Sequence, residues 1–327
     1  MPLISIGLPV YNGENYLEQS LKSILNQTFE DFELIISDNA STDATQQICL
    51  DYAASDRRIR YYRQEKNLGC ARNSNFVFEE ARGRLFKWAS HDDLHAPTFV
   101  ERCVEALRQE PSAVLACPRT ILIDGAGREI IPVKNGRRYY WLDDSGQQYR
   151  IRPYDPPRRF DSPQPYQRFW DVLLRTHWIT EIYGLIRADV LRKTSLHGGY
   201  LGTDKRIIAE LSLLGPFVEI PEVLFYYRQH PAQWKRYKVQ GPARDQYLSG
   251  EGGTWSKIPR SENLRGYLRA PMRTDLSPAQ RCLCWLGVAA WLFRIRLWPG
   301  LLAETYYNLT AAAAAPEVHR EQPARTM

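Results

Sequence analysis

The 327-residue chain is 44% hydrophobic and 24% charged, and its formal net charge at pH 7 is +6. This composition excludes a disordered or fibrous protein, and the length allows one large domain or two smaller ones. No charged segment followed by an apolar one opens the chain, so we expect no export.

The cysteines and arginines limit the kinds of partner. The only close pair among the six cysteines, Cys282 and Cys284, has one residue between its members, which fits neither a zinc site nor a redox motif. We therefore expect reduced thiols in a cytoplasmic protein. Arginines gather between residues 137 and 159, where a basic face could attract nucleotides, lipid phosphates or nucleic acid. Because no zinc-finger, RNP or helix-turn-helix pattern accompanies them, we expect no nucleic-acid partner.

The first 95 residues alternate between strand-like and helix-like segments. Strand-like runs cover 4–10, 32–37, 59–62 and 85–89, and helical patterns cover 16–25, 41–52 and 67–81. Ser41 or Thr42 should cap the second helix. The alternation predicts an α/β fold with a mostly parallel sheet and helices on both faces. Neither GxGxxG nor GxxxxGK[ST] occurs, so a dinucleotide fingerprint and a P-loop are excluded.

The fourth strand ends in two adjacent carboxylates, Asp92 and Asp93. A strand of an open α/β sheet delivers ligand groups at its carboxyl end. Mg²⁺ bound at phosphates typically takes one or two protein carboxylates. The pair therefore suits a metal ion shared with a diphosphate. The alternative is a helix start, because a helical pattern follows Pro97.

The middle of the chain is less regular. A helix is expected over 97–107, strands over 114–117 and 120–124, and a hairpin turn over 125–127 that leads into 130–133. Residues 134–165 break the pattern, and we interpret them as an acceptor-facing lid or, alternatively, a disordered insertion. A helix over 167–176 should precede a strand over 178–186. Asp204 follows a glycine-rich approach at the head of a helix, where it could also be a simple cap.

The last third begins with strands expected over 217–220 and 223–228, which end at His230. Residues 233–280 are polar and poorly periodic, typical of a flap or linker. The apolar run 282–293 is too short to cross a bilayer. It predicts an interfacial helix anchored by Trp285, Trp291 and Trp298 or, alternatively, a helix packed on this domain or on another subunit. The tail over 311–327 should be disordered.

Four segments together resemble the family 2 glycosyltransferases of the GT-A fold. They cover residues 5–12, 23–29, 33–43 and 91–93, and the resemblance extends over about residues 3–110. It implies a catalytic domain over 1–232, of which 1–110 binds a nucleotide-sugar and 111–232 binds the acceptor. Residues 233–310 would form a flap and a C-terminal helical extension, before the tail.

The resemblance also assigns residues around the nucleotide. Pro9, Tyr11 and Asn12 would line the base pocket, where Tyr11 offers a flat face for stacking. Asp38 would accept a hydrogen bond from the base. The remaining nucleotide-sugar ligands would be Asn67 and Arg72. Alternatively, Pro9 and Asn12 are turn formers and Arg72 is a surface charge.

The metal motif departs from that of the family. The family has Asp-x-Asp, sometimes with a further Asp, whereas this chain has Ser90-His91-Asp92-Asp93. We expect Asp93 to bind the metal and Asp92 to face the ribose or the donor sugar, with His91 in a structural role or, alternatively, as a third ligand. His230 resembles a family position that reaches the diphosphate or the metal, although it could be a surface turn residue.

The activity that this resemblance implies is an inverting, metal-dependent sugar transfer. Mn²⁺ or Mg²⁺ would support transfer from a nucleoside diphosphate-sugar, such as a UDP-sugar, to a hydroxyl acceptor on a polysaccharide, glycolipid or secondary metabolite. Asp204 would be the catalytic base, and Trp178 and Glu181 would bind the acceptor. The alternatives are a nucleotidyltransferase and a non-catalytic scaffold. We expect the protein in the cytoplasm or at the inner membrane face, with the C-terminal helix contacting the membrane or a second copy.

Overall fold

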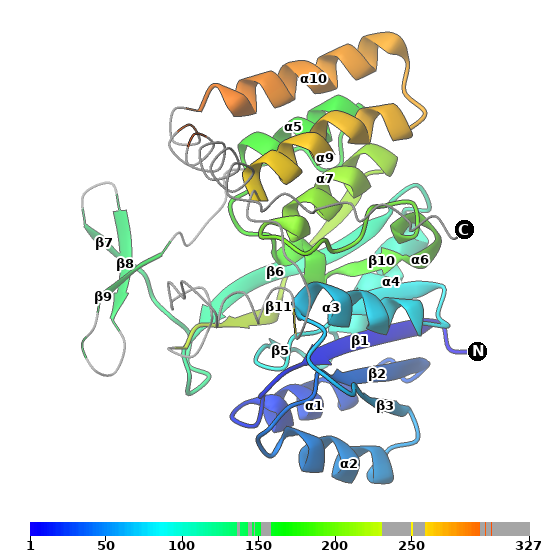
Figure 1. Ribbon diagram of the computed structural model, residues 1–327, viewed down its shortest axis with the longest axis vertical. Helices are drawn as coiled ribbons and strands as arrows, with labels where there is room; N and C mark the ends of the chain where they lie inside the picture. Colours follow the sequence, from blue (N-terminus) through cyan, green and yellow to red (C-terminus); the bar gives the residue numbers. More distant parts are fainter. Residues whose placement is uncertain are drawn as a thin grey trace, which may run out of the picture.

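A computed structural model shows one large sheet flanked by helices (Figure 1). It describes residues 1–135, 138–142, 146, 148–151, 158–230, 250, 259–294, 298 and 302. The large sheet has the strand order β3-β2-β1-β4-β10-β6-β11-β5. Its strands are β1 (Ile4–Val10), β2 (Phe32–Asp38), β3 (Ile59–Arg63), β4 (Leu85–Trp88), β5 (Leu94–His95), β6 (Leu115–Ile123), β10 (Leu185–Arg187) and β11 (Phe217–Arg228).

The predicted mostly parallel sheet is confirmed. β1 pairs in parallel with β2 and β4, β2 with β3, and β6 with β11. The short strands β5 and β10 are antiparallel to their neighbours. Every residue of β2 is buried, as expected for a strand whose two faces are both covered.

Helices cover both faces of the sheet, as predicted. They are α1 (Leu17–Leu25), α2 (Thr45–Ser55), α3 (Cys70–Glu79), α4 (Phe99–Gln109), α5 (Pro165–Leu174), α6 (Ala188–Leu191), α7 (Thr203–Leu214), α9 (Pro259–Arg273) and α10 (Pro278–Leu292). Strand residues alternate between two hydrophobic clusters: Leu34 and Ile36 join the one built with α1 and α4, whereas Ile35 joins the one built with α3, α5 and α7. In the described part of the chain, no helix combines the length and the apolarity needed to span a membrane.

Several expected boundaries differ from the structure. Residues 134–165 are not a plain loop, because they hold β7 (Val133–Asn135), β8 (Arg138–Leu142) and β9 (Gln148–Ile151), which form a small antiparallel sheet set apart from the large one in Figure 1. The expected strand over 178–186 begins instead with a short 3-10 helix, η1 (Thr180–Tyr183). β11 is one continuous strand, and shifts in its register near Pro221 accommodate the missing N–H of proline.

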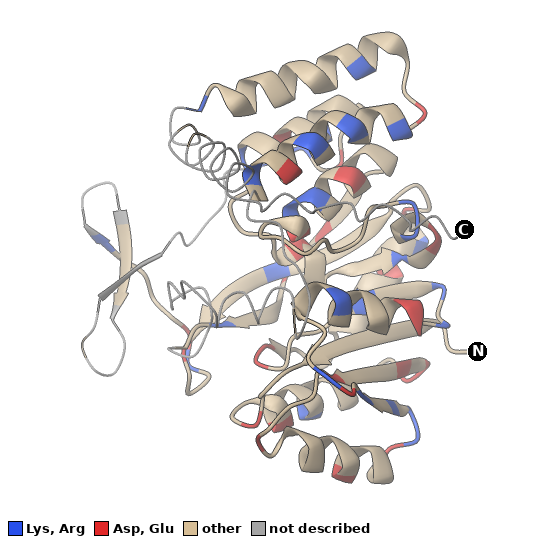
Figure 2. Ribbon diagram, in the orientation of Figure 1, with Lys and Arg blue, Asp and Glu red and all other residues tan. Residues whose placement is uncertain are grey.

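Two further expectations about helices are wrong. The second helix begins at Thr45, with Ala44 at the N-cap, because the Ser41 hydroxyl instead accepts a hydrogen bond from the Asn12 N–H. The polar stretch after residue 233 contains α9, whose buried Asn263, Tyr267 and Ala270 recur at helical spacing. The arginines of α9 are exposed, and Figure 2 marks their positions along the helix. The rest of the expected flap, 233–249 and 251–258, and the tail over 311–327 lie outside the described residues.

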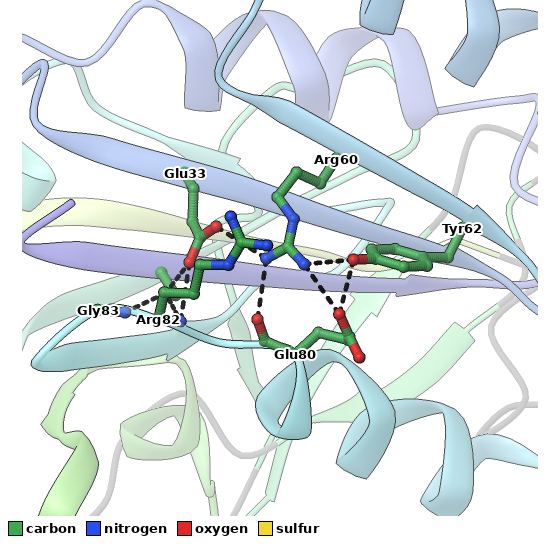
Figure 3. A network of polar contacts seen from close by, with 7 residues as sticks. Glu33, Arg60, Tyr62, Glu80, Arg82 and Gly83 are labelled. Carbon is green, nitrogen blue, oxygen red and sulfur yellow. Dashed lines mark hydrogen bonds and ion pairs between the residues drawn. The ribbon is translucent and has the colours of Figure 1, made fainter. Parts of the chain in front are cut away.

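A polar network joins the strands of the large sheet at the end where β1, β2, β3 and β4 begin (Figure 3). Glu33 on β2 accepts hydrogen bonds from the Ser5 hydroxyl at 2.6 Å and from Arg60 at 2.9 Å. Arg60 also bonds Glu80, at the end of α3, at 2.8 Å. The loop that leads into β4 is tied to the same group, because the Gly83 N–H donates to the Ser5 hydroxyl at 2.8 Å. These bonds hold β1, β2, β3 and the start of β4 in register, so the opposite ends of the strands are also fixed.

Candidate active site

A cavity of about 480 Å³ lies where β1 and β4 end. Its volume falls in the range of about 300–1,000 Å³ that is typical of ligand sites. The walls come from the loop after β1, the end of β2, the start of α3, the segment after β4, η1, and the loop that leads into α7. The cavity therefore occupies the position at which an open α/β sheet usually binds its ligands.

The loop after β1 forms one wall, and hydrogen bonds fix its shape. Pro9, Tyr11 and Asn12 all line the cavity, so the structure brings these three predicted residues together. Asn12 has a left-handed backbone with φ of 50°, which Asn tolerates better than most residues. Its side-chain oxygen accepts a hydrogen bond from the Thr42 N–H at 2.9 Å. The loop is thus held against the start of α2.

Two asparagines form the adjoining wall. Asn39 and Asn67 both line the cavity, and the amide of Asn39 donates to the side-chain oxygen of Asn67 at 2.9 Å. The same oxygen accepts from the Gly69 N–H at 2.8 Å. This clamp joins the end of β2 to the start of α3. Asn67 was expected here, whereas Asn39 was not assigned a role, although it directly follows the predicted Asp38.

Asp38 and Arg72 do not line the cavity in this structure. Asp38 is fully buried, and its oxygens accept hydrogen bonds from the Ser41 N–H at 2.8 Å, the Tyr61 hydroxyl at 3.0 Å and the Arg63 guanidinium at 2.6 Å. Burial and the Asp38 carboxylate raise the pKa of Tyr61. Arg72 is exposed on α3. Asp38 therefore holds the loop from Asn39 to Ser41 in place without itself lining the cavity.

The two adjacent carboxylates point in different directions. Asp92 lines the cavity, where its side chain accepts a hydrogen bond from the Ser90 hydroxyl and lies 3.0 Å from His230 Nε2. Asp93 is fully buried away from the cavity, and its Oδ1 accepts from the Arg228 N–H at 2.9 Å. The backbone bends at His91 and Asp92 after β4 ends, and of the two carboxylates only Asp92 lines the cavity. This arrangement differs from the expectation that Asp93 is the metal ligand.

Asp92 is held in its ionised form. Burial alone would raise its pKa, but the nearby His91 and hydrogen bonds from His230 and Ser90 outweigh burial, so the pKa lies well below its usual value. Arg228 supports the backbone here, because its guanidinium donates to the Asp92 carbonyl at 2.7 Å. The cavity therefore presents a negative charge beside an imidazole.

Asp204 lines the same cavity at the start of α7. Gly202 occupies the N-cap of α7 with φ of 87°, and Asp204 lies in the first turn with its side chain 53% exposed. It is therefore not the N-cap residue. Its Oδ1 lies 3.3 Å from His197 Nδ1, and both residues line the cavity.

His197 was not predicted, and its surroundings fix it firmly. Asn75 donates to the His197 carbonyl at 2.9 Å and accepts from its N–H at 3.0 Å. The imidazole packs edge-on against Trp88, with ring centroids 4.8 Å apart. The only signal in the sequence was the position of His197 in the segment leading to Asp204.

The expected acceptor residues lie behind the wall. Glu181 is buried and forms an ion pair with Arg158. Trp178 packs against Tyr227 with ring centroids 5.8 Å apart, and it is Tyr227 that lines the cavity. Aromatic wall residues that sequence reasoning missed are Tyr183, Tyr200 and Trp88.

The pair of Asp92 and His230 fits a divalent ion that is shared with a ligand. Among the described residues, no group of three or more His, Cys, Asp or Glu could hold a metal by itself. Adjacent ligands of an octahedral ion with bonds of 2.0–2.1 Å lie about 2.9 Å apart. The 3.0 Å between Asp92 Oδ2 and His230 Nε2 is close to that spacing, but these two atoms are hydrogen-bonded in the structure, so the imidazole would exchange this hydrogen bond for a bond to the ion. Diphosphate oxygens and water could complete the shell.

Comparisons with known proteins show which sequences and structures this chain resembles. The sequence model of the family described as "Glycosyl transferase family 2" matches residues 5–171. A glycosyltransferase of Rickettsia typhi, described as uncharacterized, is 34% identical over 140 residues, which are 42% of this chain and 42% of the relative. The match thus spans about two fifths of that relative's length.

Two solved structures have a similar fold. S. aureus TarS 1-349, in complex with UDP-GlcNAc, has a TM-score of 0.60 and 15% identity, covering 92% of this chain and 79% of that one. A mannosyltransferase from Pyrobaculum calidifontis, in complex with GDP-Man and Mn²⁺, has a TM-score of 0.51 and 14% identity, covering 96% of this chain and 76% of that one. At such identities these likenesses show the fold alone, which is GT-A.

Proposed function

Since this chain belongs to glycosyl transferase family 2, we propose that it moves a sugar from a nucleoside diphosphate-sugar to a hydroxyl acceptor with inversion of the anomeric centre. One observation supports the proposal above all others. A single cavity is lined by Asp92, His230 and Asp204. The Asp92 carboxylate and the His230 imidazole could bind a divalent ion that holds the departing diphosphate, and the exposed Asp204 carboxylate could accept a proton from an incoming hydroxyl.

The donor would occupy the walls built by the β1 loop and by Asn39 and Asn67. Tyr11 would stack on the base, and the two side-chain amides would offer donors and acceptors to the base or ribose. A UDP-sugar is the first candidate, because a structure similar in fold was solved with UDP-GlcNAc. Asp38 would act indirectly by holding the loop, whereas Arg72 would reach a bound donor only after its side chain moved.

We propose that Asp92 and His230 hold Mn²⁺ or Mg²⁺, and that Asp93 supports them from within the core. A bound ion would offset the negative charge that develops on the leaving diphosphate. Asp93 would keep β11 in place through the Arg228 N–H, so that His230, two residues later, stays beside Asp92.

Asp204 would act as the general base. It would accept the proton of the acceptor hydroxyl as that oxygen attacks the anomeric carbon, and a positioned base typically contributes about 10²- to 10⁴-fold in rate. A single displacement of this kind inverts the configuration. His197 would hold the carboxylate in place from 3.3 Å away.

The acceptor would enter along the second half of the chain. We propose that residues 1–110 bind the donor and 111–232 the acceptor, because η1 and the loop before α7 supply cavity residues from the second half. Trp178 and Glu181 would then act through neighbours, Trp178 by supporting Tyr227 and Glu181 by holding Arg158. A polysaccharide, a glycolipid or a secondary metabolite could supply the hydroxyl.

A panel of nucleoside diphosphate-sugars, each with Mn²⁺, tests the proposal. Thermal unfolding reports binding, because a ligand at 100 times its dissociation constant adds about 2.7 kcal/mol of stability. For the donor found in this way, we expect slow release of nucleoside diphosphate in water and faster release with an alcohol acceptor, and the anomeric configuration of the product would report inversion. Release of pyrophosphate from a nucleoside triphosphate and a sugar phosphate would indicate a nucleotidyltransferase instead. No stabilisation by any nucleotide would indicate a non-catalytic scaffold.

A further inference from the structure

Several large apolar side chains are exposed on α9 and α10. Exposed side chains on these helices are Leu268 (42%), Met272 (65%), Trp285 (37%), Leu286 (59%) and Phe293 (79%). The Trp285 indole donates a hydrogen bond to the Leu268 carbonyl at 3.1 Å, which joins the two helices at this surface. Large exposed apolar patches on a folded protein mark sites of interaction.

The inner side of α10 is already occupied by the protein's own core. Cys284, Val288 and Trp291 are buried, and a Cβ on Gly287 would lie only 2.2 Å from the Trp170 ring. The outward positions are Cys282, Leu286 and Phe293, which recur at helical spacing, and the sequence from 282 to 293 has no charged residue. A helix that is apolar on both sides, with one side facing solvent, is expected to bind a partner or a surface outside its own domain.

A row of positive charge lies beside this apolar surface. Arg265, Arg269 and Arg273 are exposed on α9 at intervals of four residues, and Figure 2 shows α9 with several basic segments next to a mostly uncharged α10. Glu262 pairs with Arg265 at 3.1 Å. The surface formed by Leu268, Met272, Trp285, Leu286 and Phe293 with Arg265, Arg269 and Arg273 is called the α9–α10 face below.

We propose that the α9–α10 face binds the surface of an anionic lipid bilayer. Apolar side chains of an interfacial helix enter the boundary between headgroups and acyl chains, tryptophan prefers the headgroup level, and arginines attract anionic headgroups. With α10 packed on the domain through its inner side, the helix would lie along the membrane and not cross it.

The arginine row favours a bilayer over a second copy of this chain as the occupant. In a two-fold dimer, residue i of one copy meets residue j of the other, so only residues near the axis meet their own copies. Arginines beside the apolar surface would need acidic side chains from the second copy, whereas the same face of α9 exposes Arg265, Arg269 and Arg273. An anionic bilayer complements the same arginines.

The face is connected to the proposed active site through the protein. On α9, Asn263 donates to the Leu201 carbonyl at 2.9 Å, and Leu201 belongs to the loop that lines the cavity before Asp204. A bilayer bound at this face would bring the enzyme to acceptors carried on lipids. That consequence rests on the proposed function, whereas binding of the bilayer does not.

Sedimentation of the full chain with vesicles tests the proposal. We expect the protein to bind phosphatidylcholine vesicles that contain phosphatidylglycerol, to bind pure phosphatidylcholine vesicles much more weakly, and to be released by salt. The double variant Leu286→Gln, Phe293→Ser and the triple variant Arg265→Gln, Arg269→Gln, Arg273→Gln should each lose at least tenfold in vesicle affinity. Leu50→Gln removes an exposed leucine from α2 and should bind as the wild type does.

Several results would overturn the proposal. The first is that the wild type does not bind anionic vesicles, and the second is that the double and triple variants bind them as well as the wild type does. The third is that the wild type is a dimer and the double variant is a monomer, with neither binding vesicles. Thermal unfolding of each variant checks that it is folded. Nucleotide binding is measured on the same samples, so a failure of the proposed active site is separable from a failure of the membrane face.

Discussion

The carboxylate of Asp204 lies 3.3 Å from Nδ1 of His197, at the start of the helix that closes one side of the cavity. If Asp204 is the base, Asp204→Asn should lower the rate of sugar transfer by about 10²- to 10⁴-fold. The affinity for the nucleotide should stay within a few-fold, because Asp92 and the β1 loop are untouched. Steady-state transfer and nucleotide titration check the two expectations, and a variant with normal transfer would remove Asp204 from the mechanism.

His197 should act through Asp204 and not by itself. His197→Ala frees the carboxylate from its neighbour, so we expect kcat to fall by less than in Asp204→Asn, with KM for the donor nearly unchanged. Because the two residues would work as a unit, the double variant should be no slower than Asp204→Asn alone. Additive losses in this double-mutant cycle would instead indicate that His197 acts on the substrate directly.

Substitutions of Asp92 and Asp93 should have different effects, the first mainly on metal binding and the second mainly on stability. Asp92→Ala should abolish the increase in nucleotide affinity that Mn²⁺ brings, measured calorimetrically with the ion and with a chelator. Asp93→Ala should weaken that increase without abolishing it, and should lower the free energy of unfolding by about 1–3 kcal/mol, because it leaves the buried Arg228 N–H without an acceptor. The reverse outcome would return the metal to Asp93.

The different positions of Asp92 and Asp93 show which features of the site the sequence could not predict. The buried runs of β1 and β2 and the helical spacing of α1 are local properties, so the sheet and its flanking helices were predictable. Which of two adjacent carboxylates faces a cavity depends on backbone direction after β4 and on Arg228, a residue that is distant in sequence. Asp38 was assigned to the base through the family resemblance, and its hydrogen bond with Arg63 could not be foreseen because Arg63 comes from another strand. The helix α9 was missed because its buried side contains Asn263 and its outer side is arginine-rich.

The cysteines offer a chemical probe of the cavity. Cys70 lines it at the start of α3, and Cys282 is exposed on α10. Burial raises the pKa of Cys49, Cys103 and Cys284 to about 12, and that of Cys117 well above its usual value, so these thiols should react slowly. We expect a maleimide to modify Cys282 and Cys70 in the native protein.

Saturating nucleoside diphosphate should then protect Cys70 and leave Cys282 unaffected. Mass spectrometry of peptides follows both sites in one sample, so Cys282 is the internal control. Equal labelling of Cys70 with and without nucleotide would mean that the ligand does not occupy this part of the cavity.

Lys87 should make stability depend on pH above neutrality. The side chain is buried on β4, its ammonium donates to the Tyr183 carbonyl at 2.7 Å, and burial lowers its pKa to about 7. Below pH 7 both the folded and the unfolded chain carry the proton. Between pH 7 and about 10.4, the usual pKa of lysine, the unfolded chain holds a proton that the folded chain has lost. The free energy of unfolding therefore rises with pH over that window, by up to about 1.4 kcal/mol per unit from this residue.

Lys87→Met should remove this contribution. Urea unfolding of both proteins from pH 6 to 10 gives the difference in stability, and we expect the wild type to gain on the variant steadily above pH 7 and to show a constant difference below it. Lys22→Met, which alters an exposed lysine on α1, should follow the wild-type curve apart from a small offset. A difference between wild type and Lys87→Met that does not change with pH would mean that Lys87 keeps its proton in the folded core, where the Tyr183 carbonyl and the Phe99 ring, 4.2 Å from the ammonium, would have to stabilise the charge.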